Sequence, residues 1–405
     1  MDLLQFENDI PQDAKQIRAT LQKIITDHHL VFKTNEWWRA HEFPVKEVVT
    51  ILQKGDLMRL DTVVDETYGC WRCDYLTYGL FSEMLESVDS GLRSFLPSVT
   101  KGLVRYAIHQ FGSEEQKQKY IPGLADGSLI GCFALTGPPG GSNPQDMEMK
   151  ARMTPDKKHI ALDGSKIWIT NGSVADIAIV WASLGARYKK LPEIRAFIVE
   201  RGEKGFTQQE MKHKGTLCAS NTGQLFFENC CLPKEAMLPG TEKGISAAYE
   251  CLNQARFSIG WGVIGAAKAC FAEALTFAGG RSFFNIERDI ISQPLKKKQI
   301  MQAYFADMGA RISSMEARAW RVARLIDEKG GITRNLAEAI SFLKWQNVAD
   351  ARQVANTARR ILASNAYQIE GTNETYRHYI NLDAVETYEG TPEIHQLILG
   401  NYFTA

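Results

Sequence analysis

The chain has 405 residues, of which 44% are hydrophobic, and its 47 lysines and arginines balance its 47 aspartates and glutamates. This length supports a large core in two or three packed domains, and a net charge of zero provides no basic field for nucleic acid or anionic lipid. The first ten residues contain no lysine or arginine, and no apolar run approaches the length of a membrane span. We therefore expect a soluble, cytoplasmic protein without nucleic-acid or membrane partners.

The eight cysteines do not have the spacing of a disulfide framework. Cys70 and Cys73 form a CxxC motif, but a zinc site needs a second pair of Cys or His ligands, and none follows at a suitable spacing. We predict buried thiols and no metal site.

The chain is expected to begin with helices and to continue with strands. From residue 10 to about 125, segments such as AKQIRATLQKIITDHH and LTYGLFSEMLESV repeat apolar residues at spacings of three and four. Between about 128 and 240, short β-rich runs such as HIALDGSKIWIT, DIAIVWASLG and GQLFFENCCL are separated by Gly, Asn, Asp and Pro. These patterns predict a helical domain over residues 1–127 and a β-domain over residues 128–240.

A second helical region follows Gly244. The segment ISAAYECLNQARFSIGWGVIGAAKACFAEALTFA is apolar on several faces, as expected for a helix buried between neighbours, and two long amphipathic segments come after it. No repeat or low-complexity linker interrupts the chain. We therefore predict a third domain over residues 241–405 and an α+β fold in which helix, sheet and helix regions pack as one unit.

One acidic residue near the end of the chain lies in an apolar segment. Glu389, in the sequence YEGT, is followed by Ile394, Leu397 and Ile398 at helix-like spacing. A carboxylate beside a hydrophobic helix start loses hydration, which raises its pKa and makes it a useful base. The residues alone favour a carboxylate that faces the dipole at a helix N-terminus.

Three long motifs resemble the acyl-CoA dehydrogenases: FGSEEQKQKYIPGLADGSLIGCFALTG, SKIWITNG and VETYEGTPEIHQLILG. The segments ESVDSGLRS, CLNQARFSIGWGVIGA and NLDAVETYEGT are most similar to the glutaryl-CoA dehydrogenase branch of that family. The resemblance spans nearly the whole chain. It implies an N-terminal helical domain, a central β-barrel-like domain and a C-terminal four-helix bundle, assembled as a homo-oligomer, and a tetramer is expected from the family.

The resemblance also implies a reaction and a base. Oxidation of a thioester across Cα and Cβ needs a base for the weakly acidic α-proton, while hydride leaves the β-carbon for a flavin. By resemblance Glu389 is that base, FAD is the cofactor and an electron-transfer flavoprotein receives the electrons. In the glutaryl branch the distal carboxylate then leaves as carbon dioxide, and protonated Glu389 returns a proton to give crotonyl-CoA.

Five positions match flavin contacts of the family. Trp168 in WITN is expected to cover the flavin ring, and Thr170 to hydrogen-bond near its reactive nitrogen. Without the resemblance, both residues are ordinary strand formers. Thr136 in FALTG, Arg288 and Thr391 are the other expected cofactor-binding residues.

Five further positions match contacts of the acyl-CoA substrate. Arg93 and Ser94 are expected to receive a distal carboxylate, since a guanidinium can bind a carboxylate through two parallel hydrogen bonds. Glu86 is expected beside the same pocket, and Ser142 and Arg256 elsewhere along the substrate. As isolated residues, Arg93 and Glu86 would instead be solvated charges on a helix.

Several positions depart from the family pattern. The usual LTEP and GSD sequences read LTGP and GSN, so Gly137 and Asn143 replace two acids, and Cys218 replaces the arginine of LRAS. The residues after Arg288 differ from the usual R-x-Q-F-G, and GGRSFFN is inserted before it.

The largest departure lies in RRILASNAYQIEGTNETYRHYINL. The family has a Gly-Gly-x-Gly turn here, which lets the backbone approach the cofactor diphosphate of a neighbouring subunit. Ala363, Ser364 and Ala366 replace these glycines, and their side chains would obstruct that approach. Two functions therefore remain open: an FAD-dependent dehydrogenase, or a flavin-free acyl-CoA lyase or non-catalytic acyl-CoA-binding relative.

Overall fold

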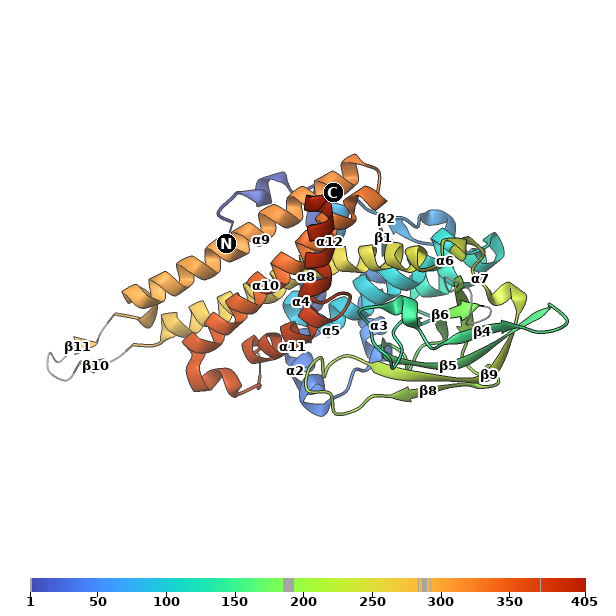
Figure 1. Cartoon of the computed structure of the whole chain (residues 1–405). Helices are drawn as coiled ribbons and strands as arrows, with labels where there is room; N and C mark the ends of the chain where they lie inside the picture. Colours follow the sequence, from blue (N-terminus) through green and yellow to red (C-terminus); the bar gives the residue numbers. More distant parts are fainter. Residues whose placement is uncertain (1, 185–192, 283, 286–289, 292, 372) are drawn as a thin grey trace.

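The computed structural model describes all residues except 1, 185–192, 283, 286–289, 292 and 372. Long helices cross one side of the molecule and a curled sheet occupies the other (Figure 1). This arrangement confirms the predicted α+β fold with helical regions before and after a central sheet.

The N-terminal region is helical, as its spacing of apolar residues predicts. Its helices are α1 (Gln12–Asp27), α2 (Leu30–Ala40), α3 (Val45–Gln53), α4 (Tyr75–Val88), α5 (Ser90–Arg93), the π-helix η4 (Ser94–Arg105), α6 (Tyr106–Phe111) and α7 (Glu114–Asp126). A short pair of strands, β1 (Leu60–Asp61) and β2 (Trp71–Arg72), lies between α3 and α4. The segment from α4 through η4 is almost entirely buried.

The central sheet follows the order β3-β6-β4-β5-β9-β8, and β7 pairs with the other edge of β6. The strands are β3 (Gly131–Ala134), β4 (Lys150–Met153), β5 (His159–Thr170), β6 (Ile177–Leu184), β7 (Glu193–Glu200), β8 (Phe206–Glu210) and β9 (Thr222–Pro233). The antiparallel pair β5–β9 has a register shift between Lys166 and Ile169, so the strand bulges at Trp168. The bulge turns this side chain out of the regular alternation.

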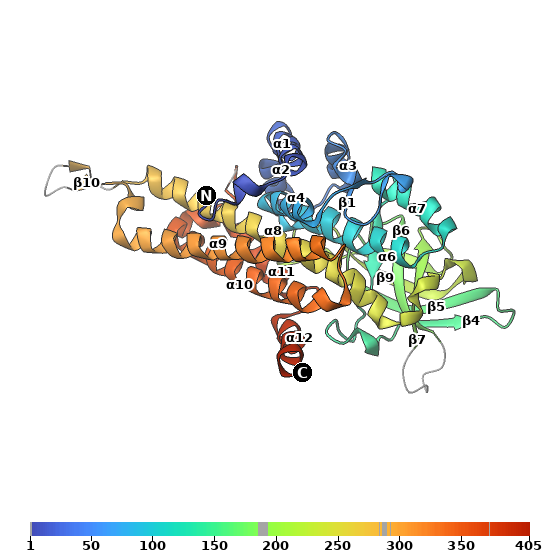
Figure 2. The same ribbon diagram turned by 90° about the horizontal axis from the view of Figure 1, so that it is seen from above.

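The C-terminal region consists of long helices that pack along one another. They are α8 (Ile245–Gly280), α9 (Gln299–Glu328), α10 (Ala337–Leu362), α11 (Thr375–Thr387) and α12 (Pro392–Thr404), with a short hairpin of β10 (Phe284–Asn285) and β11 (Ile290–Ile291) between α8 and α9. Seen from above, α12 projects from the body and carries the C-terminus at its tip (Figure 2).

Helix α8 runs through the centre of the molecule and packs against both α4 and α10. By length and composition alone it could cross a membrane, which corrects the expectation that no apolar run reaches such a length. Half of its most apolar window is buried inside the protein. Its apolar character is therefore that of a core helix, with Phe257 and Trp261 fully buried.

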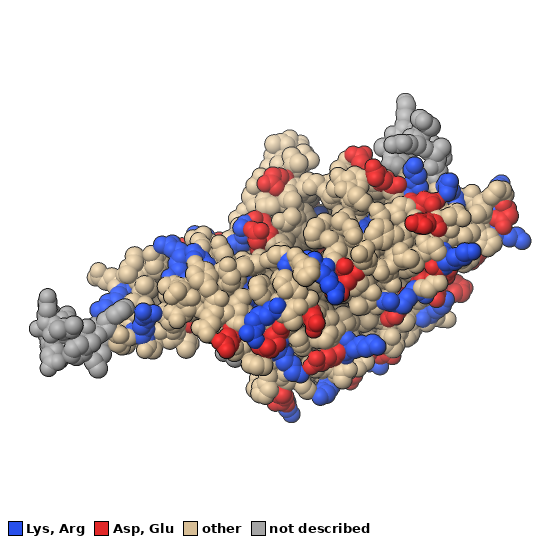
Figure 3. Space-filling model, turned by 90° about the horizontal axis from the view of Figure 1, so that it is seen from below, with Lys and Arg blue, Asp and Glu red and all other residues tan. Residues whose placement is uncertain are grey.

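The surface carries both signs of charge. On the face shown in Figure 3, lysine and arginine side chains alternate with aspartate and glutamate side chains. This mixture agrees with the balanced composition of the chain.

Candidate functional site

Glu389 lies in the tight turn between α11 and α12. Its φ of 55° is in the left-handed region, and Gly390 follows with a φ of 111°. A left-handed conformation costs a residue with a Cβ roughly 1 to 2 kcal/mol, so surrounding contacts must hold the turn. The turn directs the base away from the regular faces of both helices.

The carboxylate of Glu389 has no neutralising hydrogen bond on one of its oxygens. Oε2 is buried and has no hydrogen-bond partner among the residues that the structure describes. Burial raises the pKa of Glu389 to about 7, against the opposing positive charges of Arg93, Arg256 and Lys344. At neutral pH the group therefore exchanges readily between its carboxylate and carboxylic acid forms, as a general base requires.

The apolar residues of α12 do not supply this burial, contrary to the sequence-based interpretation. Leu397 is 64% exposed, and Ile394 and Ile398 are only partly buried. The carboxylate is instead enclosed by residues from helices far away in the sequence, since its charged neighbours come from α5, α8 and α10.

Two cations hold the backbone of the turn. Arg256 donates from Nε to the carbonyl oxygen of Glu389 at 2.8 Å, and it is 6% exposed. Lys344 donates from Nζ to the carbonyl oxygens of Glu386 and Gly390 at 2.8 and 2.7 Å. Arg256, predicted as a substrate contact, is therefore also a support of the base.

Arg93, Ser94 and Glu86 come together in the buried segment from α4 to η4. Arg93 and Glu86 form an ion pair of 2.6 Å in which neither side chain is exposed. Arg93 also donates to Ser98 Oγ at 2.9 Å and to the hydroxyl of Tyr388. Arg93 and Glu86 are therefore not the solvated surface charges that such residues would be in isolation, and their predicted role at the substrate stays a prediction.

The polar group around Arg93 is continuous with the turn that carries the base. Tyr388 immediately precedes Glu389, and its hydroxyl lies 3.4 Å from Ser94 Oγ. Burial raises the pKa of Tyr388 to about 12, so the hydroxyl stays protonated. Ser98 extends the network to Ser258 of α8 through a hydroxyl contact of 2.7 Å. An arginine and a base thus share one buried region.

Gly262 of α8 makes room for the ion pair. A Cβ at this position would lie 2.2 Å from Glu86 Oε2 and 3.1 Å from Nε of Arg93. The close approach of α8 to the ion pair therefore depends on the missing side chain.

Several residues of this site were not identified from the sequence. Tyr388 stands beside Glu389 in the YEGT motif, so its position in the motif was an available signal. Lys344, Ser98 and Gly262 carry no local signal, because each is a single residue within a helical pattern. The packing of η4, α8 and α10 brings these residues to the turn and to the Arg93–Glu86 pair.

Thr136, Trp168 and Thr170 lie at one end of the central sheet. The amide of Ile167 donates to the carbonyl oxygen of Thr136 at 3.1 Å, which places Thr136 beside the bulge of β5. Trp168 has a φ of 62° and is 60% exposed, whereas Thr170 is half-buried. An exposed indole beside two threonine hydroxyls is a suitable surface for a flat aromatic ligand.

The other predicted contacts are less closely assembled. Ser142 is exposed on the loop after β3, and Thr391 is the half-buried residue before α12. Arg288 lies outside the described residues. The turn that replaces Gly-Gly-x-Gly begins at Ala363, whose φ of 53° and ψ of −131° form a conformation natural to glycine. The turn thus keeps a glycine-like backbone at an alanine.

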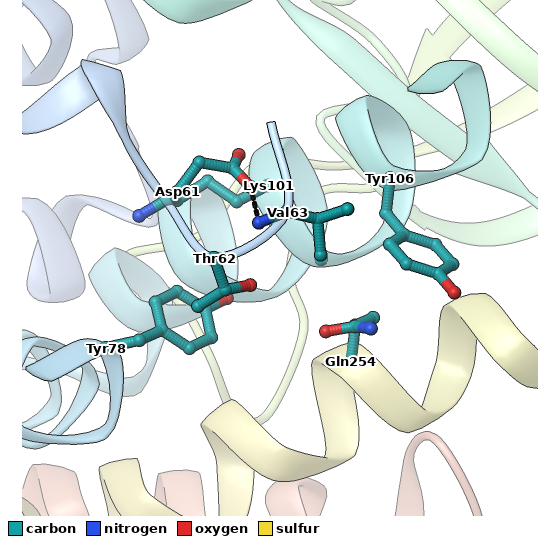
Figure 4. Close-up of a pocket in the computed structure, with 8 residues that line it drawn as sticks. Asp61, Thr62, Val63, Tyr78, Lys101, Tyr106 and Gln254 are labelled. Atoms are coloured by element: carbon teal, nitrogen blue, oxygen red, sulfur yellow. Dashed lines mark hydrogen bonds between the residues drawn. The ribbon is translucent and has the colours of Figure 1, made fainter. Parts of the chain in front are cut away.

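A small cavity lies apart from the base (Figure 4). Its volume of about 10 Å³ is enough for one water molecule. Lys101, Tyr78 and Tyr106 are among its lining residues, and Nζ of Lys101 is buried without a hydrogen-bond partner. Burial lowers the pKa of Lys101 to about 7. The cavity is too small for an acyl group and is an internal polar pocket of the helical region.

Comparisons with known proteins identify all three regions of the chain. Residues 11–128, 132–230 and 242–402 match the N-terminal, middle and C-terminal domains of acyl-CoA dehydrogenases. The chain is 32% identical to the mitochondrial short-chain specific acyl-CoA dehydrogenase of Rattus norvegicus, over 97% of this chain and 90% of that protein.

Solved structures agree with this match. The crystal structure of glutaryl-CoA dehydrogenase from Mycobacterium smegmatis has a TM-score of 0.89 and 36% identity, covering 100% of this chain and 97% of that chain. A glutaryl-CoA dehydrogenase from the same organism in complex with FADH2 has a TM-score of 0.89 and 35% identity, covering 99% and 97%. The chain, with its buried glutamate in the turn before the last helix, belongs to the acyl-CoA dehydrogenase family.

Proposed function

We propose that the protein is an FAD-dependent dehydrogenase of acyl-CoA thioesters whose acyl chain ends in a carboxylate, such as glutaryl-CoA. The observation that carries this proposal is the shared buried region of Glu389 and Arg93, joined through Tyr388. A dicarboxylic acyl-CoA needs a base at its thioester end and a cationic group at its carboxylate end. Glu389 is the base and Arg93 is the cationic group in this proposal.

Glu389 is the group that removes the α-proton. Its pKa of about 7 keeps a large fraction ionised at neutral pH, and its Oε2 atom is buried although the residue as a whole is half-buried. Arg256 and Lys344 hold the carbonyls around it, so the carboxylate is oriented before the substrate arrives. The bound flavin supplies the acceptor for the hydride that leaves the β-carbon.

The polar network around Arg93 supports a polar end of the acyl chain. Ser94, Ser98 and Tyr388 surround the guanidinium with hydroxyl groups, where a simple alkyl chain would require apolar side chains. Glu86 already balances the charge of Arg93. The selectivity of the site for a substrate carboxylate therefore comes mainly from hydrogen bonds to the guanidinium and its neighbouring hydroxyl groups. Loss of that carboxylate as carbon dioxide is the proposed second step.

The residues at the end of the sheet fit the ring of FAD. Thr136, Trp168 and Thr170 would hold the ring, with the exposed indole on its face. The diphosphate turn favours a second candidate function, because Ala363 and Ser364 put side chains where the family has bare backbone. That alternative is a flavin-free acyl-CoA lyase, or a non-catalytic acyl-CoA-binding relative, that uses the same base region.

The remaining partners follow from the proposed reaction. An electron-transfer flavoprotein would reoxidise the enzyme in the cytoplasm. Homo-oligomer formation, in the form of a tetramer, is supported by the exposed apolar residues of α12: Leu397 is 64%, Tyr402 62% and Phe403 78% exposed.

An anaerobic titration tests the proposed function. The purified protein is reconstituted with FAD and its visible spectrum is recorded while glutaryl-CoA or butyryl-CoA is added. We expect a flavin spectrum that glutaryl-CoA bleaches at lower concentration than butyryl-CoA. A protein that binds no FAD at saturating cofactor supports the flavin-free alternative, whereas preferential bleaching by butyryl-CoA contradicts the dicarboxylic substrate.

A further inference from the structure

The orientation of the base is controlled by its backbone. Oε2 of Glu389 is buried without a hydrogen-bond partner. Its φ of 55° fixes the direction in which the side chain leaves the chain. Groups that hold this turn therefore determine where the carboxylate points.

Lys344 is the group that bridges the turn. Its Nζ donates to the carbonyl oxygen of Glu386, in the last turn of α11, and to that of Gly390, on the other side of the base. The side chain is 1% exposed. A single ammonium thus ties the end of one helix to the residue that follows Glu389, and it does so from α10, an element that carries no other predicted site residue.

The opposite side of the turn is closed by His395 of α12. A Cβ built on Gly390 would lie 2.9 Å from Nε2 of His395, whose fully buried ring lies against the backbone of Gly390. Burial lowers the pKa of His395 to about 2, so the ring is neutral. Gly390 therefore contacts both the neutral imidazole of His395 and Nζ of Lys344, and these two contacts restrict the turn.

We propose that Lys344 is a positioning residue for the base: by bridging the carbonyl groups on either side of Glu389, it sets the direction of the carboxylate that takes the α-proton. This role rests on the proposed function of Glu389. Burial lowers the pKa of Lys344 itself to about 7, so at neutral pH part of the Lys344 population is charged, and that charge opposes the rise in the pKa of Glu389. The charged groups that act on Lys344 are Glu389, Arg256, Glu386 and Arg93, and the neutral His395 lies beside the same turn.

The test is the exchange of the α-proton of a bound acyl-CoA with deuterium, which needs no flavin turnover. In Lys344→Met the side chain keeps its length and loses its donors and charge. We expect the exchange rate to fall about 100-fold, because small displacements of a reacting group are that costly, while the Kd of the acyl-CoA changes less than threefold. We expect Lys344→Arg to recover the rate to within about tenfold of wild type, because it restores charge and donors.

The pH profile separates positioning from general stability. Removing the Lys344 charge should move the midpoint of the exchange profile to higher pH in Lys344→Met but not in Lys344→Arg. The matched control is Lys268→Met, since Lys268 lies between Glu83 and Glu316 at 2.7 Å from each and away from the turn. That variant should unfold at a lower temperature and keep the wild-type exchange rate and midpoint.

Each outcome decides the proposal. Equal exchange rates and midpoints in Lys344→Met and wild type overturn the positioning role alone, as does equal loss of exchange in Lys268→Met. If Lys344→Met does not fold, Lys344→Gln is measured, and a wild-type rate in that variant overturns the role. A wild-type protein that exchanges no α-proton overturns the proposed function and, with it, the positioning role.

Discussion

Two glutamates of this protein, the fully buried Glu86 and the half-buried Glu389, have opposite surroundings. Glu86 lies within α4, where its oxygens accept from Arg93 Nε at 2.6 Å and from Ser90 Oγ at 2.7 Å. Glu389 lies in a turn, where Oε2 has no partner. The same side chain is thus a structural anion in one place and a base near neutral pH in the other, and the difference is the presence of a directly bonded cation.

The positive charges near Glu389 are directed at its backbone. Arg256 and Lys344 donate to main-chain carbonyl oxygens of the turn and leave the carboxylate free. Their charges moderate the pKa of Glu389 without forming the ion pair that would hold it ionised and unreactive. A cation bonded to the carbonyl group orients a base, whereas a cation bonded to the carboxylate would neutralise it.

The largest expected effect comes from removing the basicity of Glu389. In Glu389→Gln the amide keeps the shape of the side chain and cannot accept a proton. We expect α-proton exchange of bound acyl-CoA to fall by about 10³-fold or more, with acyl-CoA affinity largely unchanged. Exchange at the wild-type rate, measured by mass spectrometry of the recovered acyl-CoA, removes Glu389 from the mechanism.

The next prediction concerns the loss of Arg93, the cation that is paired with Glu86. Arg93→Met leaves Glu86 buried without its cation, and we expect a loss of about 3 to 5 kcal/mol in the free energy of unfolding, measured by urea denaturation. The variant should also lose more affinity for glutaryl-CoA than for butyryl-CoA, because only glutaryl-CoA presents an anion to the site.

A double substitution separates these two effects. Arg93→Met with Glu86→Gln removes the unpaired charge and should recover much of the stability while the selectivity for glutaryl-CoA stays lost. Equal loss of affinity for both acyl-CoAs in Arg93→Met points to an arginine that only supports the fold.

The pH dependence follows from the unpaired glutamate. With a pKa of about 7, Glu389 loses its base form at low pH, and exchange should fall about tenfold per pH unit below 7, or about 100-fold at pH 5. Because this pKa lies above the ordinary value for glutamate, the group favours the folded state most at low pH, and that contribution is lost as the pH rises through about 7. A stability profile of Glu389→Gln should lack this change. An exchange profile with a midpoint near 4.5 contradicts a buried, unpaired base.

The sequence predicts the fold more completely than it predicts the surroundings of the two glutamates. The spacing of apolar residues locates the helical and β-rich regions. A helix buries one continuous face and a strand buries one or both of its faces, and each case gives its own regular spacing. The motif around Glu389 identifies a candidate base. It does not predict that Leu397 would be 64% exposed, since a regular apolar spacing looks the same on a core helix and on a helix that projects from the body.

The partners of the two glutamates are harder to predict. Ser90 and Arg93 lie four and seven residues from Glu86, so these contacts are close in the sequence, although the extended Asp89 separates α4 from α5 between them. Lys344 and Arg256 lie 46 and 133 residues from the carbonyl oxygens of Gly390 and Glu389. Such contacts follow from the packing of α8 and α10 against the turn, which has no local pattern in the sequence.

The smallest effect is expected at the glycine that gives the paired glutamate its space. In Gly262→Ala the new Cβ would lie 2.2 Å from Glu86 Oε2, so the ion pair or α8 must shift. Overpacking of this kind costs about 1 to 3 kcal/mol of unfolding free energy, and the selectivity for glutaryl-CoA should weaken with it. The matched control is Gly280→Ala at the end of the same helix, where a Cβ meets nothing within 4 Å and alanine favours the helix, so its stability should be unchanged or slightly higher. Because Glu389 is held by other groups, its α-proton exchange should stay near the wild-type rate in Gly262→Ala. A large loss of exchange there would mean that the two glutamates act as one coupled network, and that the paired one is more than a support for Arg93.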